Sequence, residues 1–287
     1  MRKKFHPNNI PFSVLIIIHL ILLFFTMKKK KAEKKALFIL LIANTGLCYL
    51  FEFVVLNIFK GYKYKPKFFR KKEIDNVAGA ILSQAVFIPI ITIINTAFQF
   101  NWKGKLFLSG IYSGIELLFL KLKVYAHHWW KVIYTFSLLP AIFYISDFFY
   151  RALKKGNKPI MVATLLLSII FRGANLLFIF ALVKKFRFGF GKKHNLQEHF
   201  KVGPLYSFFL AGVTTFSLVL FGNKKGGIIV VALANLLDYF LQKTSIVKGK
   251  FHDFMLNNAI HISMLGSTIA YKKLMEDAFG KFGFSKK

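Results

Sequence analysis

Two acidic residues recur at a fixed spacing inside apolar stretches of this chain. Glu116 lies in "YSGIELLFLKLK" (112–123), and Asp238 follows 122 residues later in "ALANLLDYFLQK" (232–243). An ionised carboxylate at the centre of a bilayer costs about 2.5 to 3.5 kcal/mol on insertion scales, and such acids commonly belong to proton or ion pathways. We therefore interpret Glu116 and Asp238 as candidate residues of a polar pathway. A purely structural role, in which they only hold helices together, is the alternative.

Two further sets of polar residues have helical spacing, one in each half of the chain. Residues three, four or seven positions apart lie on the same side of a helix. The first set is Asn44, Cys48 and Glu52, and the second is Ser168, Arg172 and Asn175. We expect Glu52 and Arg172 to face each other, with Asn175 nearby. They would then either line the pathway or form a pair that joins two helices.

The composition is typical of a membrane protein. Of the 287 residues, 55% are hydrophobic and 36 are Phe, and the mean hydropathy is +0.50, which is too apolar for a soluble domain of this size. The 42 Lys and Arg outnumber the 11 Asp and Glu, and they cluster between apolar runs, as at 28–35 and 60–72. This pattern favours loops that lie against anionic lipid headgroups. The sequence shows no basic soluble module, so we expect no nucleic-acid partner.

Apolar runs of about 20 residues predict membrane-spanning helices. We expect nine, at 10–27, 36–59, 77–100, 104–120, 132–149, 159–183, 203–221, 226–243 and 254–271. The expected fold class is therefore all-α, a polytopic helical membrane protein. The segments 104–120 and 226–243 are short, and whether they cross the membrane fully stays open.

The spacing between Glu116 and Asp238 extends to their surroundings. It also aligns Lys121 with Lys243, and a shift of about 123 aligns "EIDNVAGAILSQ" (73–84) with "NLQEHFKVGPLYS" (195–207). We interpret residues 1–35 as an anchor helix with a basic loop, 36–157 as a first four-helix repeat and 158–287 as a second. An even number of helices per copy makes the repeats parallel, related by an axis along the membrane normal. Association into homo-oligomers stays open.

The residues around the end of the 104–120 segment are typical of a membrane interface, where aromatic rings form a belt and lysines extend to the headgroups. The expected interfacial residues are Trp129, Trp130, Tyr125, Lys121 and Lys243. His127 and His128 lie in the same turn and are interpreted as interfacial rather than as metal ligands.

Two local patterns predict contacts between or within helices. Gly110 and Gly114 form a small-xxx-small pair, which favours close packing of two helices. Asp147 precedes Arg151 by four residues, which predicts an ion pair at the end of a helix.

The run "YSGIELLFLKLKVYAHHWWKVIY" (112–134), with "DNVAGAILSQAVFIPI" (75–90) before it, resembles a family of small, uncharacterised multi-pass membrane proteins from spore-forming Gram-positive bacteria. The shared features are a helix that begins with Asp and Asn, a Glu-x4-Lys element and a Tyr/Trp-rich turn. The resemblance covers about residues 36–155, and the second half of the chain keeps Asp238 and Lys243. It implies a cell-membrane protein, with sporulation as one context, and it brings no established activity.

The motifs of common membrane and soluble enzymes are absent from the sequence, which contains no HExxH, no GxSxG and no Walker A loop. We therefore expect no enzyme activity, no cofactor and no metal site. The expected function is a small transporter or channel-like permeation protein that uses buried carboxylates. The alternatives are a structural or assembly protein of the bacterial membrane and an intramembrane lipid-modifying enzyme. Basic residues are almost evenly divided between the two sides, so orientation stays open.

Overall fold

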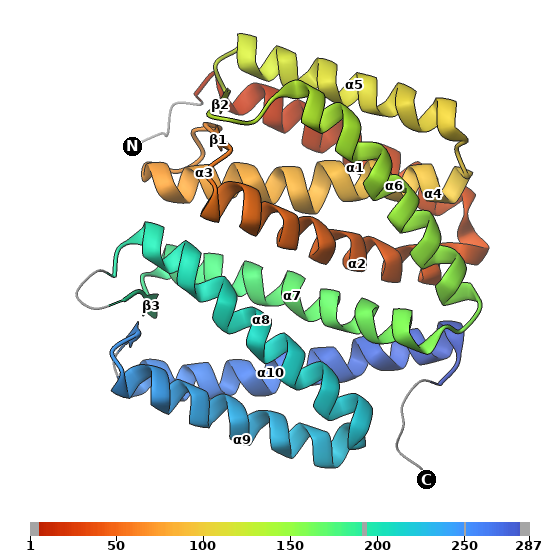
Figure 1. Cartoon of the computed structure of the whole chain (residues 1–287). Helices are drawn as coiled ribbons and strands as arrows, with labels where there is room; N and C mark the ends of the chain where they lie inside the picture. Colours follow the sequence, from red (N-terminus) through yellow and green to blue (C-terminus); the bar gives the residue numbers. More distant parts are fainter. Residues whose placement is uncertain (1–5, 191–193, 250, 282–287) are drawn as a thin grey trace. The chain divides into compact units, whose positions relative to one another are not determined.

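The computed structural model describes residues 6–190, 194–249 and 251–281, with side chains in the last range described from Met255 onward. Within these residues the fold is all-α, with nine helices when continuous helical segments are counted together, and two short strand pairs. The chain divides into two compact units, unit 1 (residues 1–151) and unit 2 (residues 152–287). Figure 1 shows the elements of each unit in the colours of the sequence.

Unit 1 begins with α1 (Asn9–Lys29). A short 3-10 turn, η1 (Lys31–Glu33), leads into α2 (Lys34–Glu52), which continues as the π-helical segment η2 (Phe53–Ile58). The strand β1 (Tyr62–Tyr64) follows. The next long helix consists of α3 (Lys72–Ile81), the π-helical segment η3 (Leu82–Phe87) and α4 (Ile88–Phe98). The unit ends with α5 (Trp102–Lys121), β2 (Tyr125–His127) and α6 (Val132–Lys154).

Unit 2 has the same order of helices and strands as the part of unit 1 that follows α1. Its elements are α7 (Lys158–Val183), β3 (Arg187–Phe188), α8 (Leu196–Leu220), α9 (Gly222–Lys243), β4 (Val247–Lys248) and α10 (Phe251–Phe279). β1 pairs antiparallel with β2, and β3 pairs antiparallel with β4. In unit 2, and in the part of unit 1 that follows α1, the chain after the first helix therefore pairs with the chain after the third.

The backbone repeats one uncommon feature before these strands. Lys60 precedes β1 with φ 52°, and Lys184 precedes β3 with φ 58°. Lys123 precedes β2 with φ 56°, and Ser245 precedes β4 with φ 56°. Left-handed backbone is uncommon for residues other than glycine, so its presence at matching turns gives both units the same chain reversal from helix to strand.

Among the described residues, seven helices are long and apolar enough to cross a membrane: α1, α2 with η2, the α3–η3–α4 helix, α6, α7, α8 and α9. The 226–243 segment, now α9, belongs to this group, whereas the expected spans at 104–120 and 254–271 do not. α5 carries Lys103, Lys105 and Glu116 within 20 residues, and α10 carries Asn257, Asn258 and His261. These polar residues reduce the apolar character of the two helices, and several of them form the contacts described below.

A π-helical segment immediately precedes Pro89, the second residue of α4. Proline has no N–H group and cannot continue the regular helical hydrogen-bond pattern, so the preceding turn must adjust. The widened turn, η3, carries Ser83, Gln84 and Phe87, which all line a cavity in this unit. π-helical turns occur frequently at functional sites.

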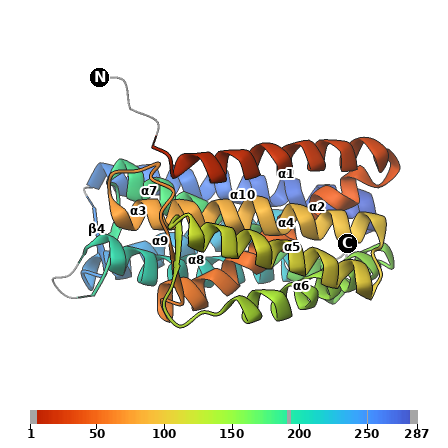
Figure 2. The ribbon, with the colours of Figure 1, turned by 90° about the horizontal axis from the view of Figure 1, so that it is seen from above.

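The core of unit 1 has two parts. Near the strands, Phe12 of α1 packs with Tyr62, Tyr125 and Trp130. Farther along the helices, Ile91 of α4 belongs to a cluster that includes side chains of α5 and α6. Figure 2 shows α1 running beside α4, and the two helices are in contact.

A close approach between two elements of unit 1 occurs at Gly79, and not at the small-xxx-small pair Gly110 and Gly114, where the sequence predicted one. A Cβ atom on Gly79 of α3 would lie 2.4 Å from Cβ of Tyr64, so only glycine lets β1 approach this helix so closely. Gly110 and Gly114 are exposed, and Cβ atoms there would meet nothing within 4 Å. The prediction that this pair packs closely on a second helix is therefore wrong for the described structure, because α5 turns that face outward.

Candidate functional site

Glu116, the acid that led the sequence interpretation, is hydrogen bonded to a histidine. It lies near the C-terminal end of α5, and its Oε1 is 2.6 Å from Nε2 of His127 on β2. The short turn after α5 brings β2 back beside the last turn of the helix, which positions the imidazole. Glu116 is only 8% exposed, and its second oxygen, Oε2, is buried with no hydrogen-bond partner among the described residues.

A second carboxyl group, that of Glu52, lies at the C-terminal end of α2. Its Oε2 accepts a hydrogen bond of 2.5 Å from the hydroxyl of Tyr62 and one of 2.9 Å from the side-chain amide of Gln84. Oε1 of Glu52 is buried and has no partner within the described part of the chain. Each of these two acids of unit 1 therefore keeps one carboxyl oxygen available for a further donor.

Aromatic side chains and Glu116 line a cavity of about 130 Å³ in unit 1. The lining includes Tyr62, Tyr64, Tyr125, Trp130, Gln84 and Glu116. Burial raises the pKa of all three tyrosines well above the ordinary value, and the nearby carboxyl of Glu52 raises it further. The tyrosines consequently remain neutral, so they contribute ring faces and hydroxyl groups to the cavity and add no negative charge.

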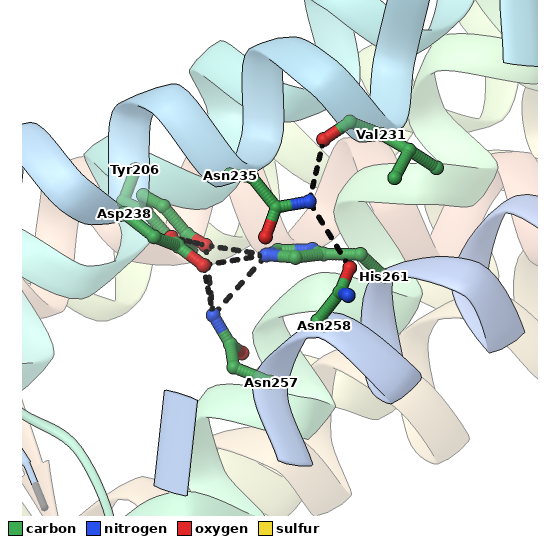
Figure 3. A network of polar contacts seen from close by, with 7 residues as sticks. All are labelled: Tyr206, Val231, Asn235, Asp238, Asn257, Asn258 and His261. Atoms are coloured by element: carbon green, nitrogen blue, oxygen red, sulfur yellow. Dashed lines mark hydrogen bonds and ion pairs between the residues drawn. The ribbon is translucent and has the colours of Figure 1, made fainter. Parts of the chain in front are cut away.

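Asp238 of unit 2 is also paired with a histidine, in a network that Figure 3 shows from close by. Its Oδ2 lies 2.9 Å from Nε2 of His261 and accepts a 2.5 Å hydrogen bond from the amide of Asn257, both on α10. Its Oδ1 accepts a 2.6 Å hydrogen bond from the hydroxyl of Tyr206 on α8. Both oxygens of Asp238 are thus satisfied. Asn235 and Asn258 form a second link between α9 and α10, at 3.1 Å.

The two acids occupy positions 122 residues apart, but their histidines come from different elements. His127 belongs to a strand, whereas His261 lies in the middle of a helix. The sequence interpretation treated His127 as interfacial and did not select His261, Tyr206 or Asn257. Asn257 and His261 are four residues apart and therefore lie on the same side of α10, and this spacing is the signal that could have identified them.

Glu52 and Arg172 belong to different units, and their expected pairing stays a prediction; each is hydrogen bonded within its own unit. The guanidinium of Arg172 donates to the Oγ atoms of Ser267 (2.6 Å), Thr268 (3.1 Å) and Ser168 (3.2 Å). Asn175 donates to the carbonyl of Phe171, one turn earlier on the same helix. These contacts connect α7 to α10 and satisfy the Arg172 side chain without Glu52.

Two residues of the expected interfacial belt are buried inside unit 1. Tyr125 and Trp130 are each only 7% exposed and belong to the core of unit 1, because the pairing of β2 with β1 turns them inward. Trp129 is 46% exposed, and its indole N–H donates to the carbonyl of Phe59. Lys121 and Lys243 are exposed.

The predicted pairing of Asp147 with Arg151 is wrong. The carboxylate of Asp147 binds Nζ of Lys105 at 2.9 Å and accepts a 2.7 Å hydrogen bond from Thr96, whereas Arg151 donates to the backbone carbonyl of Asp147. Lys105 also donates to the carbonyl of Phe100. This network joins α4, α5 and α6 at the end of unit 1 opposite the strands.

No model of a known protein family matches this chain, and neither a curated protein nor a solved structure shows significant similarity to it. The class of the protein therefore rests on its own structure. Seven helices could cross a membrane, and α1 exposes large apolar side chains such as Ile17, Phe24 and Phe25 along its length. This helical, apolar structure is compatible with an integral membrane protein.

Proposed function

We propose that the protein is a small permeation protein of a membrane, a transporter or channel whose pathway uses buried carboxyl groups. One observation carries the proposal: each unit holds an acid–imidazole pair that is at most 18% exposed, Glu116 with His127 and Asp238 with His261. Chains of Asp, Glu and His form proton relays in pumps and transporters. Such a pair can receive a proton at one partner and release it from the other while it stays hydrogen bonded.

The internal organisation supports a duplicated origin for the two pairs. The order of helices and strands after α1 is the same in both units, and left-handed residues precede the paired strands at matching places. We infer that residues following the anchor helix arose by duplication, with Glu116 and Asp238 at equivalent positions. Two parallel copies that have diverged in their histidines would give a pathway with two unequal proton sites.

Proton movement in reconstituted vesicles tests the proposal. Vesicles that contain the purified protein should dissipate an imposed pH gradient faster than empty vesicles. The substitutions Glu116→Gln and Asp238→Asn should each abolish this difference while the protein still folds, because an amide keeps the shape and one acceptor of the acid. Glu198→Gln, which removes an acid from the start of α8, serves as the matched control and should leave the flux unchanged.

A structural or assembly protein is the second candidate, and the Lys105–Asp147 network favours it. That network, like the contacts of Arg172, joins helices through polar groups that already have partners. If the unmodified protein moves neither protons nor small ions under any imposed gradient, the permeation proposal fails. Losses of folded yield, rather than of flux, in Glu116→Gln and Asp238→Asn would then assign the two pairs to structure.

A further inference from the structure

The cavity of unit 1 lies beside two of the few acidic residues of a strongly basic protein. The chain carries a formal charge of +31, with 11 acidic residues in all. One of these acids, Glu116, lines the cavity, and another, Glu52, is hydrogen bonded to two lining residues, Tyr62 and Gln84. Both acids are more than nine-tenths buried, and each has a buried oxygen without a partner among the described residues. Buried carboxyl oxygens without a partner are costly, so a cation that entered the cavity beside them would be held strongly.

The aromatic lining of the cavity indicates which kind of cation fits. Rings of Tyr62, Tyr64, Tyr125 and Trp130 surround the same space as the carboxyl of Glu116. Aromatic faces attract cations, and cages of such rings are a common means of binding quaternary ammonium groups. We propose that this cavity binds a small organic ammonium ion, with the cation against the aromatic rings and its charge balanced by Glu116. The site concerns binding only and does not depend on whether the protein moves anything.

The size of the cavity limits the ligand. Its volume is about 130 Å³, and an apolar protein cavity of about 150 Å³ accommodates benzene. A group of roughly five or six non-hydrogen atoms therefore fits, such as tetramethylammonium or ethanolammonium.

A neighbouring groove adds a second source for the ammonium group. An open, mainly apolar groove of about 920 Å³ is lined by residues of α1, α4 and α5. It shares Leu15, Tyr112 and Ile115 with the cavity, so the two spaces lie on either side of the same side chains. The ammonium group could consequently belong to a lipid headgroup whose chain lies in the groove, or to a free amine.

Fluorescence of Trp130 provides a local measurement of binding. In a background with Trp102→Phe and Trp129→Phe, Trp130 is the one remaining tryptophan of the three in the chain. The purified protein in an uncharged detergent is titrated with tetramethylammonium chloride at constant ionic strength. Tert-butanol, an uncharged molecule of similar shape, and sodium chloride serve as comparison ligands. We expect a saturable change with tetramethylammonium and none with either comparison ligand.

Substitution of the acid tests the charge balance. Glu116→Gln should weaken tetramethylammonium binding at least about tenfold, because the negative charge that balances the cation inside the cavity is lost. The matched control Glu198→Gln should change the affinity less than about twofold. An equal response to tert-butanol, or an unchanged affinity in folded Glu116→Gln protein, would overturn the proposal. If Glu116→Gln does not fold, the comparison of charged and uncharged ligands on the unmodified site still decides.

A competition experiment distinguishes a lipid headgroup from a free amine as the source of the ammonium group. Ethanolammonium and detergent-dispersed phosphatidylethanolamine are each added to protein bound to tetramethylammonium, with phosphatidylglycerol of the same chains as the control lipid. Competition by the amine-bearing lipid alone assigns the site to a headgroup, and competition by free ethanolammonium alone assigns it to a soluble ion. Both results support an ammonium site. Equal competition by phosphatidylglycerol would instead show that the acyl chains displace the probe, and it would contradict the charge-based assignment.

Discussion

The Lys105–Asp147 ion pair offers the sharpest test of the helix packing in unit 1. Nζ of Lys105 lies 2.9 Å from Oδ2 of Asp147, and the two side chains are 5% and 18% exposed. At an effective dielectric constant of about 20, this distance corresponds to about 6 kcal/mol of attraction before desolvation is counted. Removing one partner of a buried pair typically costs about 3 to 5 kcal/mol, because the other charge stays buried.

The two single substitutions should differ in cost. Lys105→Met leaves the carboxylate of Asp147 with its hydrogen bond from Thr96 and some exposure to solvent, so we expect a loss of about 3 kcal/mol. Asp147→Asn leaves the ammonium group of Lys105 deeply buried with the carbonyl of Phe100, so we expect about 4 kcal/mol. In the double variant neither charge remains, and its loss should fall short of the summed single losses by about 2 to 3 kcal/mol.

A double-mutant cycle compares four proteins: the unmodified protein, Lys105→Met, Asp147→Asn and the double variant. The free energy of unfolding of each is measured by denaturation in mixed micelles. Arg151→Gln is the matched control, since Arg151 is exposed and donates to the backbone carbonyl of Asp147 rather than to its carboxylate; we expect a change below about 0.5 kcal/mol. Losses that add to within about 0.5 kcal/mol for Lys105 and Asp147 would refute the pairing. A coupling between Asp147 and Arg151 in its place would restore the helix-end pair that the sequence predicted.

Three other outcomes can be checked independently. Gly79→Ala should lower the free energy of unfolding by about 1 to 3 kcal/mol, because the added Cβ would lie 2.4 Å from Cβ of Tyr64. Gly110→Ala should be neutral or stabilising, because the added Cβ meets nothing within 4 Å. Thermal unfolding of the two variants measures the difference. Since the pKa values of Tyr62, Tyr64 and Tyr125 are raised, these residues should stay un-ionised in the folded protein above the ordinary tyrosine pKa of about 10. The free energy of unfolding should therefore fall as the pH rises past that value. Tyrosinate absorbance, measured together with unfolding, tests this; an ordinary titration of all three tyrosines in the folded protein would show that they are solvated. Glu52→Gln and Arg172→Gln should cost stability additively, since each residue is bonded within its own unit; a double variant more stable than this sum would show that the two side chains meet.

The sequence predicted the helices well, because one local property, the apolar character of a segment, decides where they form. Long apolar runs bounded by lysines gave the all-α class and most helix positions, because a segment that avoids water must satisfy its backbone internally. The same reasoning selected Glu116, Asp238 and Glu52 as acids placed in apolar surroundings, and the structure finds Glu116 and Glu52 buried and Asp238 nearly so. It also expected α5 and α10 to be spans, and these two helices are not among the seven in the described residues that are long and apolar enough to cross a membrane.

The partners of these acids could not be predicted in the same way. A helical pattern shows which residues share a face, but it does not show which neighbour that face meets. Arg151 was chosen for Asp147 because it is four residues away, whereas Lys105, on another helix and 42 residues earlier, is the actual partner. His127 was set aside because the turn that carries it looked interfacial, and only its strand pairing brings it to Glu116.

The sequence by itself determined that this chain forms apolar helices with basic ends and that a few acids are placed among them. These properties depend on transfer of side chains and backbone out of water, which is additive along the chain. Only the tertiary structure decided that two of the acids meet histidines, that Tyr125 and Trp130 turn inward, and that a cavity forms beside Glu116. Those outcomes depend on the rotation and register of each helix against its neighbours, which are set jointly by contacts between residues far apart in the sequence.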